Sequence, residues 1–182
     1  MAIKGILKMG NPVLTERSKE VDLSNSDYIE RIIEDMTDTM KHYNGAGLAA
    51  PQIGYPLRIM MFGFDFNPRY PNEAPIPITI LINPQMKIIN DTLAEDWEGC
   101  LSVPGIRGKV PRYLGIEYTG VDENGNSITR KVENFHARVF QHEYDHLEGI
   151  LFPARVKDFK NFGFEDELRN VIALKYRAGT KS

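Results

Sequence analysis

The stretch NFHARVFQHEYDHL, residues 134–147, decides how the rest of this sequence is interpreted. Apolar and histidine side chains recur in it every three or four residues, at Phe135, Val139, His142 and His146. This spacing predicts an α-helix that turns these side chains to one buried face. We expect Asn134 to cap the start of the helix and Gly149 to end it.

Within this helix, the run His142-Glu143-Tyr144-Asp145-His146 has the pattern H-E-x-x-H. Because helix positions i and i+4 share one face, both imidazoles can bind the same metal ion, and Glu143 can take a proton from a water molecule on that metal. Imidazoles on a buried face need a partner, which a metal supplies. The pattern therefore favours a hydrolytic metal site over two histidines that are merely packed or solvated.

A third metal ligand must come from elsewhere in the chain. The extended pattern of some zinc peptidases fails here, because Phe152 stands where its last histidine belongs. A carboxylate among residues 165–167 would make the chain a small H-E-x-x-H metallopeptidase with Glu165 or Glu167 as third ligand. A binding module with a structural zinc would need a fourth protein ligand, and His136 is wrongly placed on the helix for that role.

The sole cysteine, Cys100, is the upstream candidate for the third ligand. An isolated cysteine is more often a small buried hydrophobe, but its thiolate is also a strong ligand for first-row metals. Beside H-E-x-x-H we favour ligation. One thiolate and two imidazoles leave a fourth position for water, which is typical of a catalytic site.

Length and composition indicate one catalytic domain over residues 1–182, with 42% hydrophobic residues to form a core. The net charge of −3 implies no general affinity for nucleic acid or for an anionic membrane. The N-terminal residues lack the apolar run of a signal peptide, and no segment is apolar enough to span a bilayer. A lone cysteine favours a reducing compartment, so we expect a cytoplasmic protein.

Helical and strand patterns alternate along the rest of the chain. A first helix is expected to be capped by Ser24 or Ser26, to carry apolar residues from Tyr28 to Met40 at helical spacing, and to end at Asn44-Gly45. Strands are expected over residues 57–64, 78–82, 87–89, 113–119 and 127–132, with a proline-rich loop over 65–77, a hairpin turn over 122–125 and a last helix over about 165–176. This order predicts an α+β fold class: antiparallel sheets packed around a central metal-binding helix, with an N-terminal and a C-terminal helix.

A glycine-rich segment, GAGLAAPQ, covers residues 45–52. It lacks the Lys-Ser/Thr pair of a phosphate-binding loop. Its two glycines, Gly45 and Gly47, let a backbone pass close to another group, and Gln52 offers a side-chain N–H donor at its end. A tight turn with an exposed amide is the alternative interpretation.

Three segments together, residues 45–52, 98–102 and 142–146, closely resemble the signature of the bacterial peptide deformylases, in order and spacing over nearly the whole chain. The resemblance implies metal ligation by Cys100, His142 and His146, general acid/base catalysis by Glu143, and oxyanion binding by Gln52 and the backbone N–H of Leu101. It also implies a supporting ion pair of Glu98 with Arg112, and contacts of Gly47 and Arg107 with the substrate backbone. We expect Gly45 and Gly47 to close a small formyl pocket, and Phe135 and Val139 to line an apolar pocket for methionine unless they are ordinary core.

The reaction implied by this resemblance removes the formyl group from the N-terminal formyl-methionine of nascent polypeptides and releases formate. Metal-bound water would attack the formyl carbon while Glu143 transfers the proton to the departing nitrogen. The resemblance implies one divalent metal ion, Fe²⁺ in the cell, with Zn²⁺, Ni²⁺ or Co²⁺ as substitutes. Transient ribosome contact is a further expectation, and four basic residues near the C-terminus would form the patch for it: Arg169, Lys175, Arg177 and Lys181. The alternative interpretation is that these positive charges only stabilise the C-terminus of a helix.

The chain departs from the commonest pattern of this family at three places, none of which is a metal ligand. Ala46 stands where a larger aliphatic residue is usual, and the loop over residues 65–77 is longer than in many members. Pro153 and Ala154 replace a more familiar acidic-arginine pair. These departures bear on the shape of the cleft and on side-chain preference.

Overall fold

The computed structural model describes residues 2–168 and residue 172 of this chain. Two α-helices and six strands carry the fold, with four short 3-10 helices between them, over the described residues. The main elements are α1 (Ser26–His42), β1 (Gly47–Ala49), β2 (Ile59–Phe64), β3 (Ile76–Cys100), β4 (Val103–Val121), β5 (Ser127–Glu133), α2 (Asn134–Leu147) and β6 (Phe162–Phe164). The 3-10 helices are η1 (Pro12–Thr15), η2 (Ala50–Ile53), η3 (Phe152–Arg155) and η4 (Phe159–Asn161).

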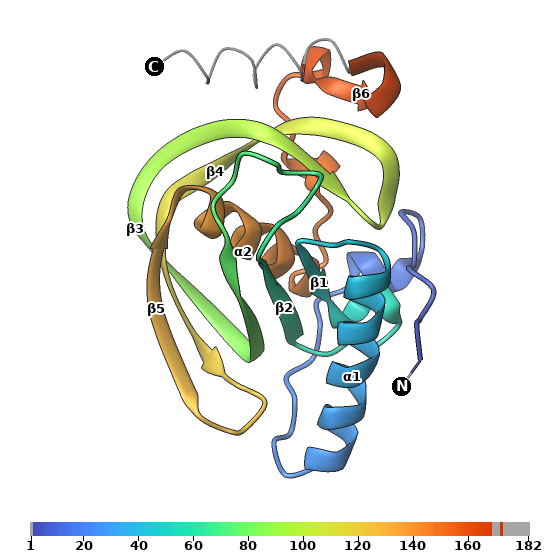
Figure 1. Ribbon diagram of the computed structural model, residues 1–182, viewed down its shortest axis with the longest axis vertical. Coiled ribbons are helices and arrows are strands. Elements are labelled where there is room, and N and C mark those ends of the chain that lie inside the picture. The colour runs from blue at the N-terminus through green and yellow to red at the C-terminus, as the bar shows by residue number, and fades with distance from the viewer. Residues whose placement is uncertain (1, 169–171, 173–182) are drawn as a thin grey trace.

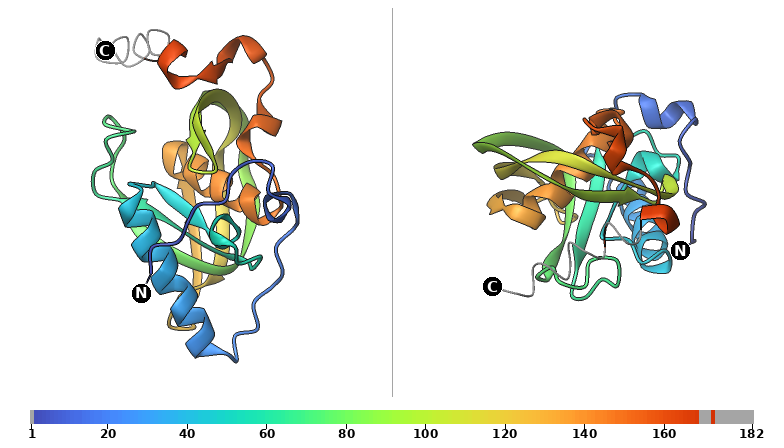
Figure 2. Two further views of the ribbon diagram at one scale, coloured as in Figure 1. Left: turned by 90° about the vertical axis from the view of Figure 1, so that its right-hand side faces the viewer. Right: turned by 90° about the horizontal axis from the view of Figure 1, so that it is seen from above.

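The strands form one antiparallel sheet that wraps around α2, as the α+β prediction required (Figure 1). The strand order is β1-β2-β3-β4-β5, and β6 adds to β4. Successive side chains of β2 point to opposite faces of the sheet, and each face is covered by a helix. Met60, Phe62 and Phe64 pack with α2, whereas Ile59 and Met61 pack with α1 on the opposite face. The helix α2 is therefore central, and α1 lies outside the sheet (Figures 1 and 2).

Two strands predicted as separate, residues 78–82 and 87–89, belong to the single long strand β3. Its pairing with β4 continues from Ile82 to Cys100, interrupted by several register shifts, including one between Glu98 and Cys100. Such bulges bend a strand without ending it. The sequence pattern misses this continuity because residues 89–93 are exposed and show no apolar alternation.

The predicted helix caps are wrong by one residue. The N-cap of α1 is Asn25, between the two serines that were expected, and it makes no side-chain capping bond. Asn134 is the first residue of α2 rather than its cap, because β5 runs directly into the helix. Its φ of 54° makes the sharp turn between strand and helix, a conformation that asparagine tolerates.

The ends of the two helices follow the predictions more closely. Gly149, with φ of 71°, follows α2, and Asn44 with φ of 50° follows α1. Tyr28 is 41% exposed and does not join the inner face of α1. Residues 165–168 and 172 are helical, but most of the predicted C-terminal helix, including its basic residues, lies outside the described part. In that described part, we find no helix with the length and apolar character needed to cross a membrane.

Candidate metal centre

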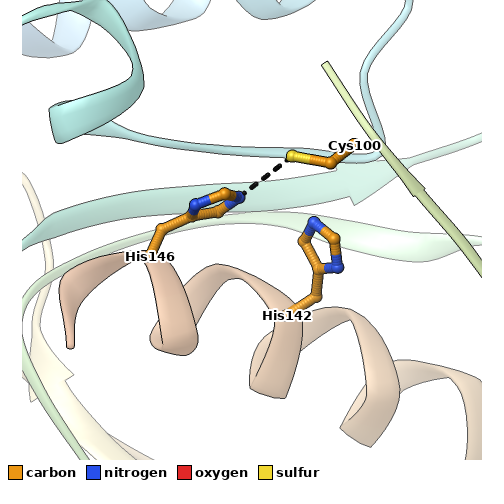
Figure 3. Close-up of side chains that lie close together, drawn as sticks. All are labelled: Cys100, His142 and His146. Atoms are coloured by element: carbon orange, nitrogen blue, oxygen red, sulfur yellow. Dashed lines mark hydrogen bonds between the residues drawn. The ribbon is translucent and has the colours of Figure 1, made fainter. Parts of the chain in front are cut away.

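Three potential metal-binding side chains converge between α2 and the end of β3. The ligand atoms of Cys100, His142 and His146 all lie within 4.8 Å of one another. The Cys100 Sγ lies 3.2 Å from Nε2 of His146. Both imidazoles project from successive turns of α2 toward the cysteine (Figure 3). The two helix positions and the distant cysteine are therefore brought to one point.

Cys100 reaches this point because β3 and β4 form a tight hairpin around it. Cys100 pairs with Val103, and only Leu101 and Ser102 lie between them. Gly99 is required beside it, since a Cβ there would come within 2.9 Å of the Arg107 side chain. The hairpin and the bulge before it aim the sulfur at α2.

The Glu98 carboxylate organises the residues around the centre. It accepts hydrogen bonds from Arg112 at 2.9 and 3.0 Å, from Arg138 at 2.8 Å and from Nδ1 of His142 at 2.9 Å. Its pKa, which burial by itself would raise, is held far below the usual value by Arg112 and His142. Because Nδ1 of His142 is engaged, its Nε2 is the nitrogen left for a metal. The expected Glu98–Arg112 pair is present and buried.

Three members of this network were not predicted from the sequence: Arg138, Asp145 and Arg155. Arg112 also donates to Asp145 at 2.5 Å, and Arg155 donates to Asp145 at 2.7 and 3.1 Å. Arg138 and Asp145 carry charges on buried positions of α2. That placement was a usable signal, because a charge on a buried helix face requires a partner.

The ionisable groups at the centre shift one another's pKa values. Burial by itself would raise the pKa of the Cys100 thiol, but the His146 and His142 imidazoles hold it well below its usual value. Burial would lower the pKa of His142, yet its bonds to Cys100 and Glu98 raise it well above the usual value. The neighbouring imidazoles therefore favour the thiolate form of Cys100, which is the form that binds metals.

The Glu143 carboxyl group is buried beside the two histidines. Burial raises its pKa to about 7, and its Oε2 has no hydrogen-bond partner among the described residues. Gly47 of β1 lies directly against it, since a Cβ at Gly47 would come within 2.6 Å of the carboxyl carbon. A thiolate, two imidazoles and an unpaired carboxyl group fit one divalent metal ion and a reacting molecule beside it.

Gln52 is buried next to the same centre. Its Oε1 accepts a bond from the Ala49 N–H at 2.8 Å, which fixes the orientation of the amide. Its Nε2 then faces Ser102 Oγ at 3.1 Å and Cys100 Sγ at 3.5 Å. The alternative interpretation of residues 45–52, a tight turn with an exposed amide, is therefore wrong for Gln52, which is 2% exposed.

A cavity opens beside Cys100 and His142, two of the three potential metal ligands. Most of the predicted pocket residues line it, together with residues predicted for catalysis: Gly47, Gln52, Leu101, Phe135, Val139 and Glu143. The lining also includes Arg69, Tyr70 and Trp97, for which the sequence carried no local signal. Gly45 lies behind this lining, where a Cβ would meet Met40 and Leu101. Arg107 is outside this lining, where its side chain lies against Gly99 and donates a hydrogen bond to Glu165 at 3.2 Å. The Glu165 carboxylate, which the metallopeptidase alternative would use as its third metal ligand, is therefore paired with Arg107 instead.

The fold and the site together define a class: an α+β metallohydrolase whose central helix carries H-E-x-x-H. A model of the polypeptide deformylase family matches residues 3–162. Peptide deformylase 1 of Nitrosomonas europaea is 52% identical over 91% of this chain and 94% of its own length, and peptide deformylase 2 of Ralstonia nicotianae is 53% identical over the same shares. The Met-Ala-Ser-bound structure of a class I type b peptide deformylase from Acinetobacter baumannii has a TM-score of 0.82 at 32% identity, covering 85% of this chain and 99% of that one. This chain belongs to the polypeptide deformylase family.

Proposed function

We propose that this chain is a metal-dependent peptide deformylase, which removes the formyl group from the N-terminal formyl-methionine of nascent polypeptides and releases formate. The observation that carries the proposal is the convergence of Cys100, His142 and His146 beside the unpaired carboxyl group of Glu143. Family membership supports the reaction. The Acinetobacter baumannii relative binds Met-Ala-Ser, a peptide that begins with methionine.

Cys100, His142 and His146 would hold one divalent cation in this proposal, with Fe²⁺ as the cellular metal and Zn²⁺, Ni²⁺ or Co²⁺ as substitutes. When bound, such a cation lowers the pKa of water and polarises a carbonyl group. The Glu98–Arg112 pair supports the site by orienting His142. A carboxylate behind a metal-binding histidine fixes its tautomer and ring orientation.

Glu143 is the proposed general acid and base. Its carboxyl group accepts a proton as the formyl carbon is attacked, and then delivers that proton to the departing amine nitrogen. Its burial and its unpaired Oε2 leave it available for both transfers. Gly47 supports this role because its lack of a side chain leaves room for the carboxyl group.

Gln52 and the backbone N–H of Leu101 are the proposed oxyanion donors. The Gln52 amide is already oriented by its bond from Ala49, so its Nε2 needs little reorganisation to meet negative charge. Gly47 and Arg107 would contact the substrate backbone. Gly45 and Gly47 would close the small pocket for the formyl group, which the close packing around both glycines supports. Phe135 and Val139 would take the methionine side chain, which their place in the cavity lining supports.

The cellular setting is part of the same proposal. Residues 1–182 would act as one catalytic domain in the cytoplasm, on the N-termini of nascent chains, with transient ribosome contact. The net charge of −3 supports action without direct nucleic-acid or membrane binding.

The test is formate release from formyl-Met-Ala by protein purified without oxygen, with metal analysis of the same sample. We expect turnover and about one divalent metal ion per chain. Glu143→Gln should keep the metal and lose nearly all turnover, while Glu133→Gln, an exposed glutamate before the same helix, should keep both. An active, metal-loaded Glu143→Gln enzyme would exclude the proposed acid/base role.

The cysteine has its own test. Cys100→Ser should lose most bound metal, because the hydroxyl group is a much poorer ligand than a thiolate. Retention of metal and activity in this variant would instead favour the metallopeptidase alternative.

A further inference from the structure

The loop over residues 65–75 contributes an aromatic ring to the cavity. Tyr70 lines it, and its ring centroid lies 5.0 Å from that of Phe135. Phe135 in turn packs edge-on against Phe64 of β2, at 6.2 Å. The Tyr70 ring therefore extends an aromatic wall that begins in the core and ends at the cavity.

The positively charged Arg107 side chain also contacts the Tyr70 ring. The guanidinium carbon of Arg107 lies 5.8 Å from the centre of the Tyr70 ring, a cation–π distance. Arg107 is itself fixed, because its side chain is only 8% exposed, pairs with Glu165 and lies against Gly99. Tyr70 is thus held between an apolar ring and a fixed positive charge.

The loop is anchored close to Tyr70. Asn67 is 3% exposed and donates to the carbonyl of Asn44 at 3.3 Å. It also accepts from the N–H of Arg69 at 2.9 Å, and its carbonyl accepts from the N–H of Tyr70 at 3.0 Å. Buried polar anchors of this kind specify one conformation. The loop therefore presents Tyr70 in a defined position next to the glycine-rich segment.

We infer that Tyr70 is a specificity-determining residue that closes the outer side of the pocket for the first side chain of the substrate. This inference rests on the proposed function. The ring would contact a methionine thioether, because sulfur packs favourably against aromatic rings. It would also limit the size of that side chain, because it is braced by Phe135 and Arg107 and cannot easily give way. A loop outside the three signature segments would then set the side-chain preference.

The test compares kcat/KM for formyl-Met-Ala and formyl-Trp-Ala. We expect Tyr70→Ala to lower kcat/KM for formyl-Met-Ala about tenfold, the upper range of a sulfur–aromatic contact, and to raise the relative rate with formyl-Trp-Ala. Tyr70→Phe should keep the wild-type ratio, because the ring forms the wall. Phe66→Ala is the matched control, since Phe66 belongs to the same loop and is 71% exposed.

The outcomes separate this inference from the proposed function. A wild-type protein that releases no formate from formyl-Met-Ala would overturn both. A wild-type ratio of the two rates in Tyr70→Ala, with wild-type activity on formyl-Met-Ala, would overturn the role of Tyr70 alone. If Tyr70→Ala is too unstable to assay, Tyr70→Leu tests the same ratio with a smaller loss of packing, and an unchanged ratio there is equally decisive against it.

Discussion

Replacing Glu98 by glutamine tests whether one buried carboxylate holds the centre together. Glu98 is 3% exposed and accepts bonds from Arg112, Arg138 and His142. The amide has nearly the same shape but carries no charge, so both guanidinium groups lose a buried counter-ion. Breaking a buried ion pair by removing one partner costs about 3–5 kcal/mol.

The expected loss can be measured in two ways. For a chain of this size, each kcal/mol lowers Tm by about 2–4 °C, so Glu98→Gln should lower Tm by roughly 6–20 °C. Loss of the partner that orients His142 should also weaken metal binding by about 10–100-fold. Thermal unfolding in excess Zn²⁺, followed by circular dichroism, measures the change in Tm, and competition with a metal chelator measures the change in metal affinity.

An exposed ion pair supplies the control. Glu117 lies 3.7 Å from Lys131, whose side chain is 71% exposed, and such pairs contribute about 0.2–1 kcal/mol. Glu117→Gln should therefore cost far less than Glu98→Gln and leave metal affinity unchanged. If both variants lose the same stability, the Glu98 network does not stabilise the fold as we describe.

Three further results are expected. Gln52→Ala should lower kcat about 10²–10³-fold, the usual effect of losing one oxyanion donor, and an unchanged kcat in steady-state assays would make Gln52 structural. Gly47→Ala should lower turnover but keep the metal, because the added Cβ would displace the Glu143 carboxyl group. Steady-state rates and metal analysis of the same sample check this. Burial by itself would raise the pKa of Asp35, but the Lys4 ammonium at 3.2 Å helps hold it below its usual value. A lowered folded-state pKa stabilises the fold above the unfolded pKa of about 3.9, and this contribution is lost as pH falls through the folded value. Asp35→Asn should therefore be less stable than wild type at neutral pH, with the difference shrinking below about pH 4; a constant difference in urea unfolding across this range would contradict the assignment.

Local patterns were sufficient for the helix that carries both histidines and for the hairpin that leads into it. The three- and four-residue spacing predicted α2 within the bounds that the structure shows, and the Asp122 turn predicted the hairpin into β5. Hydrophobic periodicity works here because each of these elements buries one face. It failed on β3, where the middle of the strand is exposed. The expected N-cap residues were also one position off, because neither helix has a capping side-chain bond at its start.

The sequence by itself predicted the donor types, the helix that carries two of them, and Cys100 as the third. These depend on residue identity and on spacing within short segments, which helical geometry converts directly into position. Only the tertiary structure decided what surrounds them. Arg138 and Asp145 bind partners 33 to 44 residues away in the chain, Tyr70 packs against Phe135 beside the cavity, and Gly47 lies against Glu143. Contacts between distant segments leave no local periodicity, because they arise from how a bent sheet closes around a helix.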